Sequence, residues 1–277
     1  MTRNSLIQQI QSKKSYLCVG LDSDPGKIPR SLSGFPDPAF EFNKRIIDAT
    51  HTHCVAYKIN TAFYEVSGAA GWECMKKTAD YIPSTHFKIA DAKRGDIGNT
   101  ASLYARTFFE TLSFDAVTVS PYMGEDSVRP FLEYEDRWTI LLGLTSNTGA
   151  ADFELQTCEN GLLFESVIRK ASQWGTTENL MFVIGATQAE WFTHVRTLAP
   201  DHFYLVPGVG VQGGSLKEIS LQALNKDFGL LVNASRAIIY AGSGEDFAEK
   251  AGQVAAGYSS EMSGYLEKLK VKNSAKS

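Results

Sequence analysis

Eight short apolar segments, rich in β-branched and aromatic residues, alternate along the chain with longer segments of helical period. Each apolar segment is short enough to be a buried strand, and the stretches between them repeat apolar residues every three or four positions. This alternation is typical of repeated βα units around a parallel sheet. The predicted strands are Tyr16–Asp22, Val55–Asn60, His86–Lys93, Ala116–Pro121, Trp138–Ser146, Leu180–Ala186, Phe203–Gly210 and Phe228–Ser235.

The number of strands distinguishes between two architectures of the α/β class. Eight strands, each followed by a helix, predict a TIM (β/α)8 barrel. A doubly wound open sheet would instead place a Gly-rich phosphate-binding turn directly after the first strand, but that strand runs into Leu21-Asp22-Ser23-Asp24-Pro25. The barrel is therefore the predicted fold. Segments with helical period include Ala39–His51, Thr100–Thr111, Phe164–Trp174 and Gln188–Ala199.

No internal segment rich in Pro, Ser or Gly divides the chain, so residues 1–277 are predicted to form a single barrel domain. Met1–Lys14 would add a helix before the first strand, and Asp246–Leu269 a long closing helix. Only the polar segment after Leu269, residues 270–277, has the composition of a disordered tail.

The overall charge does not indicate a polyanionic partner. A formal net charge of −4 and a pI near 5.8 provide no sequence-wide cationic field, and the sequence has no local basic patch. The N-terminus lacks an apolar signal core, and no apolar run approaches the ~20 residues that span a bilayer. These features predict a cytoplasmic protein that binds neither nucleic acid nor membrane.

The four cysteines are scattered without a Cys-x-x-Cys pair, which indicates reduced packing residues rather than a disulfide framework or a zinc site. His51, His53 and Cys54 are close in sequence, but no neighbouring residue completes a tetrahedral set of ligands. No metal site is predicted.

Charged residues gather at the predicted C-terminal ends of the strands, where barrels carry their functional residues. Asp22 ends the first strand, Lys58 lies on the second, and Asp91 and Lys93 end the third, followed by Asp96 on the loop. Because Asp91 and Lys93 are two residues apart, both side chains are expected to point into the barrel mouth. A lone Asp-x-Lys-x-x-Asp run is weak evidence, but its convergence with Asp22 and Lys58 favours a functional cluster.

Glycines and an arginine at the last two strand ends predict a phosphate site, because barrels commonly bind phosphate there through backbone N–H groups. Four glycines between Gly208 and Gly214 permit a close approach of the backbone. Arg236 can donate two charge-assisted hydrogen bonds to a phosphate, and Gln212 can donate from its amide. The glycines alone would be consistent with an ordinary turn, but Arg236 on the adjacent strand end favours phosphate binding.

The motifs that contain these residues resemble, along nearly the whole chain, the orotidine 5′-monophosphate decarboxylases, specifically their longer bacterial subgroup. Each motif is short, but seven in the same order make the resemblance specific. They are Leu-Cys-Val-Gly-Leu-Asp22, Tyr-Lys58-Ile-Asn, Asp91-Ala-Lys93-Arg-Gly-Asp96-Ile-Gly-Asn-Thr100, Ser120-Pro-Tyr-Met-Gly124, Leu-Thr-Ser146-Asn, Pro207-Gly-Val-Gly-Val-Gln212-Gly-Gly and Ser235-Arg236.

The resemblance implies a cofactor-independent lyase that converts orotidine 5′-monophosphate to UMP and CO2, the last step of de novo UMP biosynthesis. Lys58, Asp91, Lys93 and Asp96 would form an alternating network of charges at the reacting carbon. The resemblance also implies a homodimer in which Asp96 and Thr100 reach across the interface into the neighbouring site.

Substrate-binding roles are implied in the same way. Asp22 and Lys58 would bind the ribose hydroxyls, Ser146 the pyrimidine ring, and Gln212 and Arg236 the phosphate. The full implied substrate-binding set is Asp22, Thr100, Ser146, Pro207, Gln212, Ser235 and Arg236.

A lysine between aspartates suits this reaction, because losing CO2 from C6 of the pyrimidine leaves an electron pair in the ring plane that the π system delocalises poorly. The Lys93 ammonium could stabilise that carbanion and then protonate it, and flanking carboxylates would keep Lys93 charged. Two alternatives remain at this stage. One is a sister decarboxylase or aldolase that uses Mg²⁺ on phosphorylated open-chain sugars; the other is a non-catalytic nucleotide-binding barrel.

Overall fold

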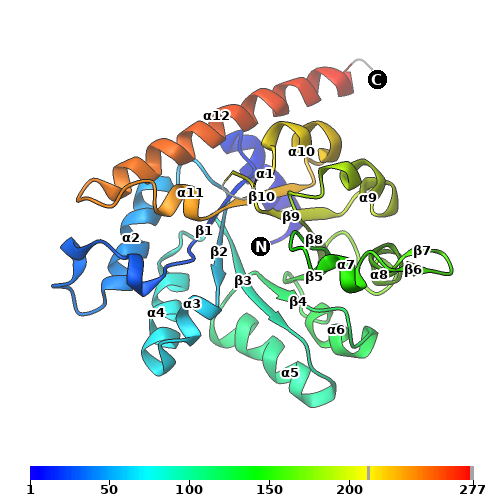
Figure 1. The fold of residues 1–277 in the computed structure, drawn as a ribbon, viewed down its shortest axis with the longest axis horizontal. Helices are drawn as coiled ribbons and strands as arrows, with labels where there is room; N and C mark the ends of the chain where they lie inside the picture. The colour runs from blue at the N-terminus through cyan, green and yellow to red at the C-terminus, as the bar shows by residue number, and fades with distance from the viewer. Residues whose placement is uncertain (211–212, 275–277) are drawn as a thin grey trace.

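Eight parallel strands close into a barrel in the computed structural model, which describes residues 1–210 and 213–274. Neighbouring strands follow the chain order, and β1 closes the barrel by pairing with β10, where Leu17 lies opposite Val232. The predicted TIM barrel is thus confirmed (Figure 1). The barrel strands are β1 (Leu17–Gly20), β2 (Ala56–Asn60), β3 (Phe87–Arg94), β4 (Ala116–Val119), β5 (Trp138–Leu144), β8 (Leu180–Ile184), β9 (Phe203–Pro207) and β10 (Leu230–Ala234).

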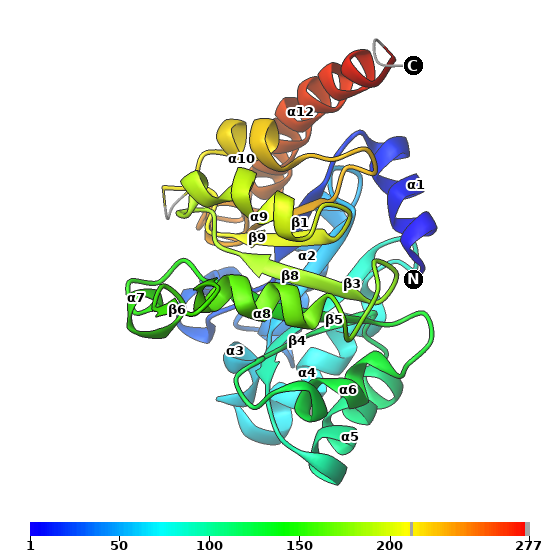
Figure 2. The same cartoon turned by 90° about the vertical axis from the view of Figure 1, so that its right-hand side faces the viewer.

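Helices surround the barrel and follow its strands along the chain (Figure 1). The final helix, α12, packs along α2 and against α11, and Figure 2 shows its C-terminal part extending beyond the barrel. The longer helices are α1 (Arg3–Lys13), α2 (Pro38–Thr50), α4 (Gly68–Tyr81), α5 (Gly98–Arg106) with a π-helical turn at Thr107–Thr111, α6 (Glu125–Leu132), α8 (Leu163–Ala171), α9 (Phe192–Leu198), α10 (Leu216–Ala223) and α12 (Phe247–Ser274).

Several short elements are inserted where strands end, and the sequence does not predict them. A four-residue helix holds too few apolar positions to display a period, so its local pattern resembles a loop. The short helices are α3 (Ala62–Glu65), α7 (Ala150–Phe153) and α11 (Arg236–Ile239), and a small hairpin joins β6 (Thr157–Cys158) to β7 (Gly161–Leu162).

Local sequence explains where several helices begin. Asp37 precedes Pro38 at the start of α2, and its carboxylate accepts a hydrogen bond from the Phe40 N–H at 3.0 Å. Ser215 caps α10 by accepting from the Glu218 N–H at 3.2 Å. Such caps satisfy N–H groups that have no partner within the helix.

The last helix extends into the segment that the sequence predicts to be disordered. The sequence predicts disorder from about residue 270, but α12 continues to Ser274. No Gly or Pro follows Gly264 to end the helix, and the intervening residues include Leu, Lys and Glu, which are good helix formers. Residues 275–277 lie outside the described residues.

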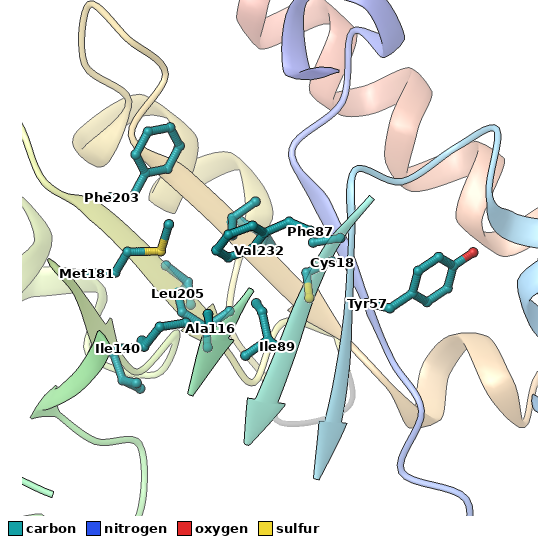
Figure 3. Packing of buried hydrophobic residues seen from close by; sticks show 14 of the residues in the cluster. Cys18, Tyr57, Phe87, Ile89, Ala116, Ile140, Met181, Phe203, Leu205 and Val232 are labelled. Carbon is teal, nitrogen blue, oxygen red and sulfur yellow. The ribbon is translucent and has the colours of Figure 1, made fainter. Parts of the chain in front are cut away.

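The barrel interior is filled by apolar side chains, as expected for a packed core. Phe87 and Phe203 each meet Trp138 edge to face near the N-terminal ends of their strands, with ring centroids 6.0 and 6.4 Å apart. Figure 3 shows Ile89 and Leu205 among the other interior side chains, whereas Tyr57 points out of the barrel. These aromatic rings pack the interior at the N-terminal end of the barrel.

Candidate active site

A cavity of about 480 Å³ opens at the C-terminal ends of the barrel strands. This volume lies within the usual range for small-molecule sites. The predicted site residues on its wall are Asp22, Lys58, Asp91, Lys93, Ser146, Pro207, Ser235 and Arg236, and the other lining residues include Asn60, Thr145, Asn147, Glu154, Gly208 and Asn233.

Two lysines and two aspartates form a continuous chain of ion pairs at one side of the cavity. Lys58 Nζ lies 3.2 Å from Asp22 Oδ1 and 2.9 Å from Asp91 Oδ2. Lys93 Nζ lies 2.6 Å from Asp91 Oδ1. The sequence-based expectation that these four side chains converge is therefore met in the structure.

Burial and charge have opposing effects on this chain of ion pairs. Burial alone would lower the pKa of Lys58, but the carboxylates of Asp91 and Asp22 raise that pKa above its usual value. Burial alone would raise the pKa of the Asp91 carboxyl, but the Lys58 and Lys93 ammonium groups hold it well below its usual range. Asp91 is therefore a carboxylate and Lys58 an ammonium at neutral pH.

Lys93 reaches the cavity through a distortion of its strand. The register between β3 and β4 shifts between Ala90 and Arg94, and Lys93 has a φ of +46°. Simple alternation along a regular strand is therefore the wrong reason for its orientation, although Asp91 and Lys93 do line the same cavity. Irregular strands of this kind can redirect a side chain beside an active site. The Lys93 side chain is half exposed, whereas Lys58 is buried.

Arg94 anchors the strand on the outer side of this distortion. Its guanidinium donates to the Ala92 carbonyl at 3.1 Å, pairs with Glu65 on α3, and lies 5.4 Å from the ring centroid of Tyr104 on α5. These contacts fix the strand directly beyond Lys93. The sequence places Arg94 in a motif but does not indicate this structural role.

The opposite side of the cavity carries the residues predicted to bind phosphate. Gly208 has a φ of +96°, which favours glycine, and it lies between Pro207 and the start of the loop. Arg236 is exposed at the rim, at the start of α11. Gln212, predicted to bind phosphate, lies outside the described residues, as does Val211.

Ser235 fits at the rim because the neighbouring strand carries a glycine. A Cβ atom built on Gly20 would lie 1.8 Å from Ser235 Oγ, so a larger residue there would displace the serine. Asn233 donates from Nδ2 to Ser235 Oγ at 3.2 Å. The sequence places Asn233 among the polar residues that end the last strand but assigns it no role.

Glu154 holds the segment that presents Ser146. It follows α7 and accepts two hydrogen bonds from Thr145, from the backbone N–H at 2.7 Å and from the hydroxyl at 2.8 Å. The sequence did not identify Glu154, because it lies in a loop with no periodic pattern.

Asp96 and Thr100 do not line the cavity of their own chain. Asp96 lies on the loop after β3, where its Oδ1 accepts a hydrogen bond from the Ile97 N–H, and Thr100 is exposed on α5. The single chain therefore does not bring them together with Lys93.

Within residues 1–210 and 213–274, no group of three or more His, Cys, Asp or Glu side chains is placed to hold a metal ion. His51 and His53 therefore do not form a site with Cys54, which is buried. The same described part of the chain contains no helix with the length and apolarity needed to cross a bilayer.

Comparison with known proteins points to one family. The profile of the family described as "Orotidine 5'-phosphate decarboxylase / HUMPS family" matches residues 15–251. An orotidine 5′-phosphate decarboxylase of Phocaeicola vulgatus is 57% identical over 259 residues, covering 92% of this chain and 95% of the relative. One from Christiangramia forsetii is 53% identical over 272 residues, covering 97% of this chain and all of the relative.

Solved structures agree with the sequence comparison. The OMP decarboxylase of Leishmania donovani has a TM-score of 0.79 and 36% identity, covering 94% of this chain and 99% of that one. A putative orotidine-monophosphate decarboxylase of Toxoplasma gondii has a TM-score of 0.85 and 32% identity, covering 95% and 98%. With the barrel, the ion-pair chain and these matches taken together, the chain belongs to the orotidine 5′-phosphate decarboxylase / HUMPS family.

Proposed function

We propose that this protein decarboxylates orotidine 5′-monophosphate to UMP and CO2, without metal or cofactor, as the last step of de novo UMP biosynthesis. The observation that carries the proposal is the Lys93 ammonium on the cavity wall, held by Asp91 at 2.6 Å, with Arg236 on the same cavity. This arrangement offers a positive charge and a proton at one side of the cavity and a phosphate-binding cation at its rim.

The chemical step requires one bond to break and one to form. The bond between C6 and the carboxylate carbon breaks, CO2 leaves, and the electron pair stays on C6. Lys93 stabilises this carbanion and then transfers a proton to C6, which produces UMP, and the neutral amine regains its proton from solvent. Lys58, held by two carboxylates, keeps Asp91 charged beside Lys93.

Electrostatic attraction at Lys93 does not account for the whole rate increase. Two unit charges at ~4 Å and an effective dielectric near 20 attract each other by about 4 kcal/mol, less than a difficult decarboxylation requires. The remainder is assigned to remote binding energy, with Arg236 and Gln212 on the phosphate and Asp22 and Lys58 on the ribose. Ser146 would contact the ring, with Pro207 and Ser235 completing the pocket.

The ion pairs of Lys58 argue against the Mg²⁺-dependent alternative. Asp22 and Asp91 both face the ammonium of Lys58, so a magnesium ion bound between these carboxylates would have to displace that lysine. A non-catalytic nucleotide-binding barrel would have no use for Lys93 on the cavity wall.

The direct test is incubation of the purified protein with orotidine 5′-monophosphate in EDTA, following the loss of substrate ultraviolet absorbance. We expect full turnover, because the proposed chemistry uses only side chains. Complete loss of activity in EDTA, restored by Mg²⁺, would support the metal-dependent alternative. No turnover with or without Mg²⁺ by correctly folded protein would contradict the proposed function.

We also propose that the protein is a cytoplasmic homodimer in which Asp96 and Thr100 complete the partner's site. Large apolar side chains are exposed near these two residues: Ile97 is 56% and Leu103 51% exposed. The loop after β4, whose Met123 lies against Gly95, exposes 83% of Tyr122. Exposed apolar residues grouped in this way are typical of a protein interface.

Mixing two inactive variants tests the shared site. A Lys93→Ala chain and an Asp96→Ala chain, unfolded together and refolded as an equal mixture, would form heterodimers with one intact site. We expect about one quarter of wild-type activity, because about half the dimers are mixed and each has one of two sites restored. Activity no higher than that of the separate variants would contradict sharing of Asp96, with a refolded wild-type sample as the control.

A further inference from the structure

We propose that Thr118 on β4 is a positioning residue for the decarboxylation, because its hydroxyl holds the Lys93 backbone and the Asp91 carboxylate in a single geometry. Thr118 is completely buried and does not line the cavity, so it has no direct contact with a substrate there. The inference rests on the proposed function and concerns how Lys93 is held in place.

The first step of the argument is that the Lys93 backbone needs external support. A residue with a Cβ atom in the left-handed region costs about 1–2 kcal/mol, and Lys93 has a φ of +46°. The register shift between Ala90 and Arg94 interrupts regular pairing with β4 at this point. Without another partner, the Lys93 N–H would lose the hydrogen bond that a regular ladder supplies.

The Thr118 hydroxyl is that partner, and it also contacts the charged Asp91 carboxylate. Its Oγ1 accepts a hydrogen bond from the Lys93 N–H at 2.9 Å and donates one to Asp91 Oδ1 at 3.1 Å. The same Asp91 oxygen binds Lys93 Nζ at 2.6 Å. One hydroxyl therefore connects the backbone of Lys93 with the carboxylate that holds its ammonium.

This geometry predicts a specific kinetic consequence. Without the hydroxyl, Thr118 would no longer hold the Lys93 backbone or the Asp91 carboxylate that binds the Lys93 ammonium. The ribose and phosphate contacts elsewhere in the cavity would remain. Misplacement of a reacting group by about 1 Å can cost about 100-fold in rate. The chemical step should therefore suffer more than nucleotide binding.

The test compares Thr118→Val with Thr118→Ser and a matched control, Thr139→Val. Valine keeps the shape of threonine but removes both hydrogen bonds, whereas serine keeps them. Thr139 is also completely buried, on β5, and its hydroxyl has no hydrogen-bond partner within the described residues, so its replacement removes none. The readouts are kcat, inhibition by UMP, and the midpoint of thermal unfolding.

We expect Thr118→Val to lower kcat by about 30-fold with UMP inhibition changed by less than about 2-fold, and Thr118→Ser and Thr139→Val to stay within about 3-fold of wild type. A folded Thr118→Val enzyme with wild-type kcat would overturn the proposal. A loss of UMP affinity equal to the loss of kcat would also overturn it, since that pattern indicates a general collapse of the cavity.

A second pair of variants keeps the test decisive if Thr118→Val does not fold. Serine and cysteine have similar size, but a thiol forms weak hydrogen bonds. Thr118→Cys with a kcat about 10-fold below that of Thr118→Ser would support the proposal, and equal values would overturn it. Inactivity of the wild-type protein itself would instead reject the proposed function, so the two failures are distinguishable.

Discussion

Replacing Lys93 with alanine is expected to lower turnover of orotidine 5′-monophosphate by at least about 10⁴-fold, because the variant loses both the charge that stabilises the carbanion and the proton that quenches it. The fold should survive. The side chain is half exposed, and Asp91 retains Lys58 and the Thr118 hydroxyl as partners after the substitution. No buried charge is therefore left without compensation.

The measurement is loss of substrate absorbance over hours at high enzyme concentration, accompanied by circular dichroism and UMP binding. Lys88→Ala is a suitable control, because Lys88 lies on the same strand between Phe87 and Ile89, whose side chains fill the interior. Lys88 therefore faces outward, and its replacement should leave kcat within about 2-fold. A folded Lys93→Ala enzyme with near-normal turnover would remove Lys93 from the mechanism.

The second large effect is expected at Arg236. Arg236→Ala should lower kcat/KM for orotidine 5′-monophosphate by about 10²- to 10³-fold, because a bidentate contact between two charged groups is lost. Arg236→Lys should be intermediate, since lysine keeps the charge but not the planar fork. Stability should change little, because Arg236 is exposed and has no ion pair within the described residues.

Orotidine, which lacks the phosphate, is the matched substrate for this experiment. Its slow decarboxylation should be nearly the same in wild type and Arg236→Ala, because neither enzyme has a phosphate to hold. Equal losses with both substrates would indicate that Arg236 acts through the shape of the cavity, and an unchanged kcat/KM for the nucleotide would refute its role.

The sequence predicts the barrel well because parallel strands are buried on both faces. Segments such as Leu180–Ile184 are apolar throughout, and this signal does not depend on distant parts of the chain. Strand ends are less predictable: β9 ends at Pro207 rather than Gly210, because the residues that follow enter a turn with positive φ at Gly208. The short helices are missed because they carry no period.

Part of the membership of the candidate site is predictable from the sequence, but its geometry is not. Asp22, Lys58 and Asp91 could be placed at one rim from strand ends alone. The left-handed conformation of Lys93 could not, because it depends on a register shift and on a hydroxyl from another strand. Glu154 was missed for a similar reason, since its two hydrogen bonds to Thr145 arise only when the loop folds back on the strand.

The aromatic layer of Phe87, Trp138 and Phe203 has a consequence for the order of events after bond cleavage. Because these rings pack the N-terminal end of the interior, newly formed CO2 would leave through the same opening as the nucleotide. While the nucleotide carbanion occupies that opening, the CO2 would stay near C6 and could recombine with it. Under the proposed mechanism, rapid protonation of C6 by Lys93 would then prevent this recombination.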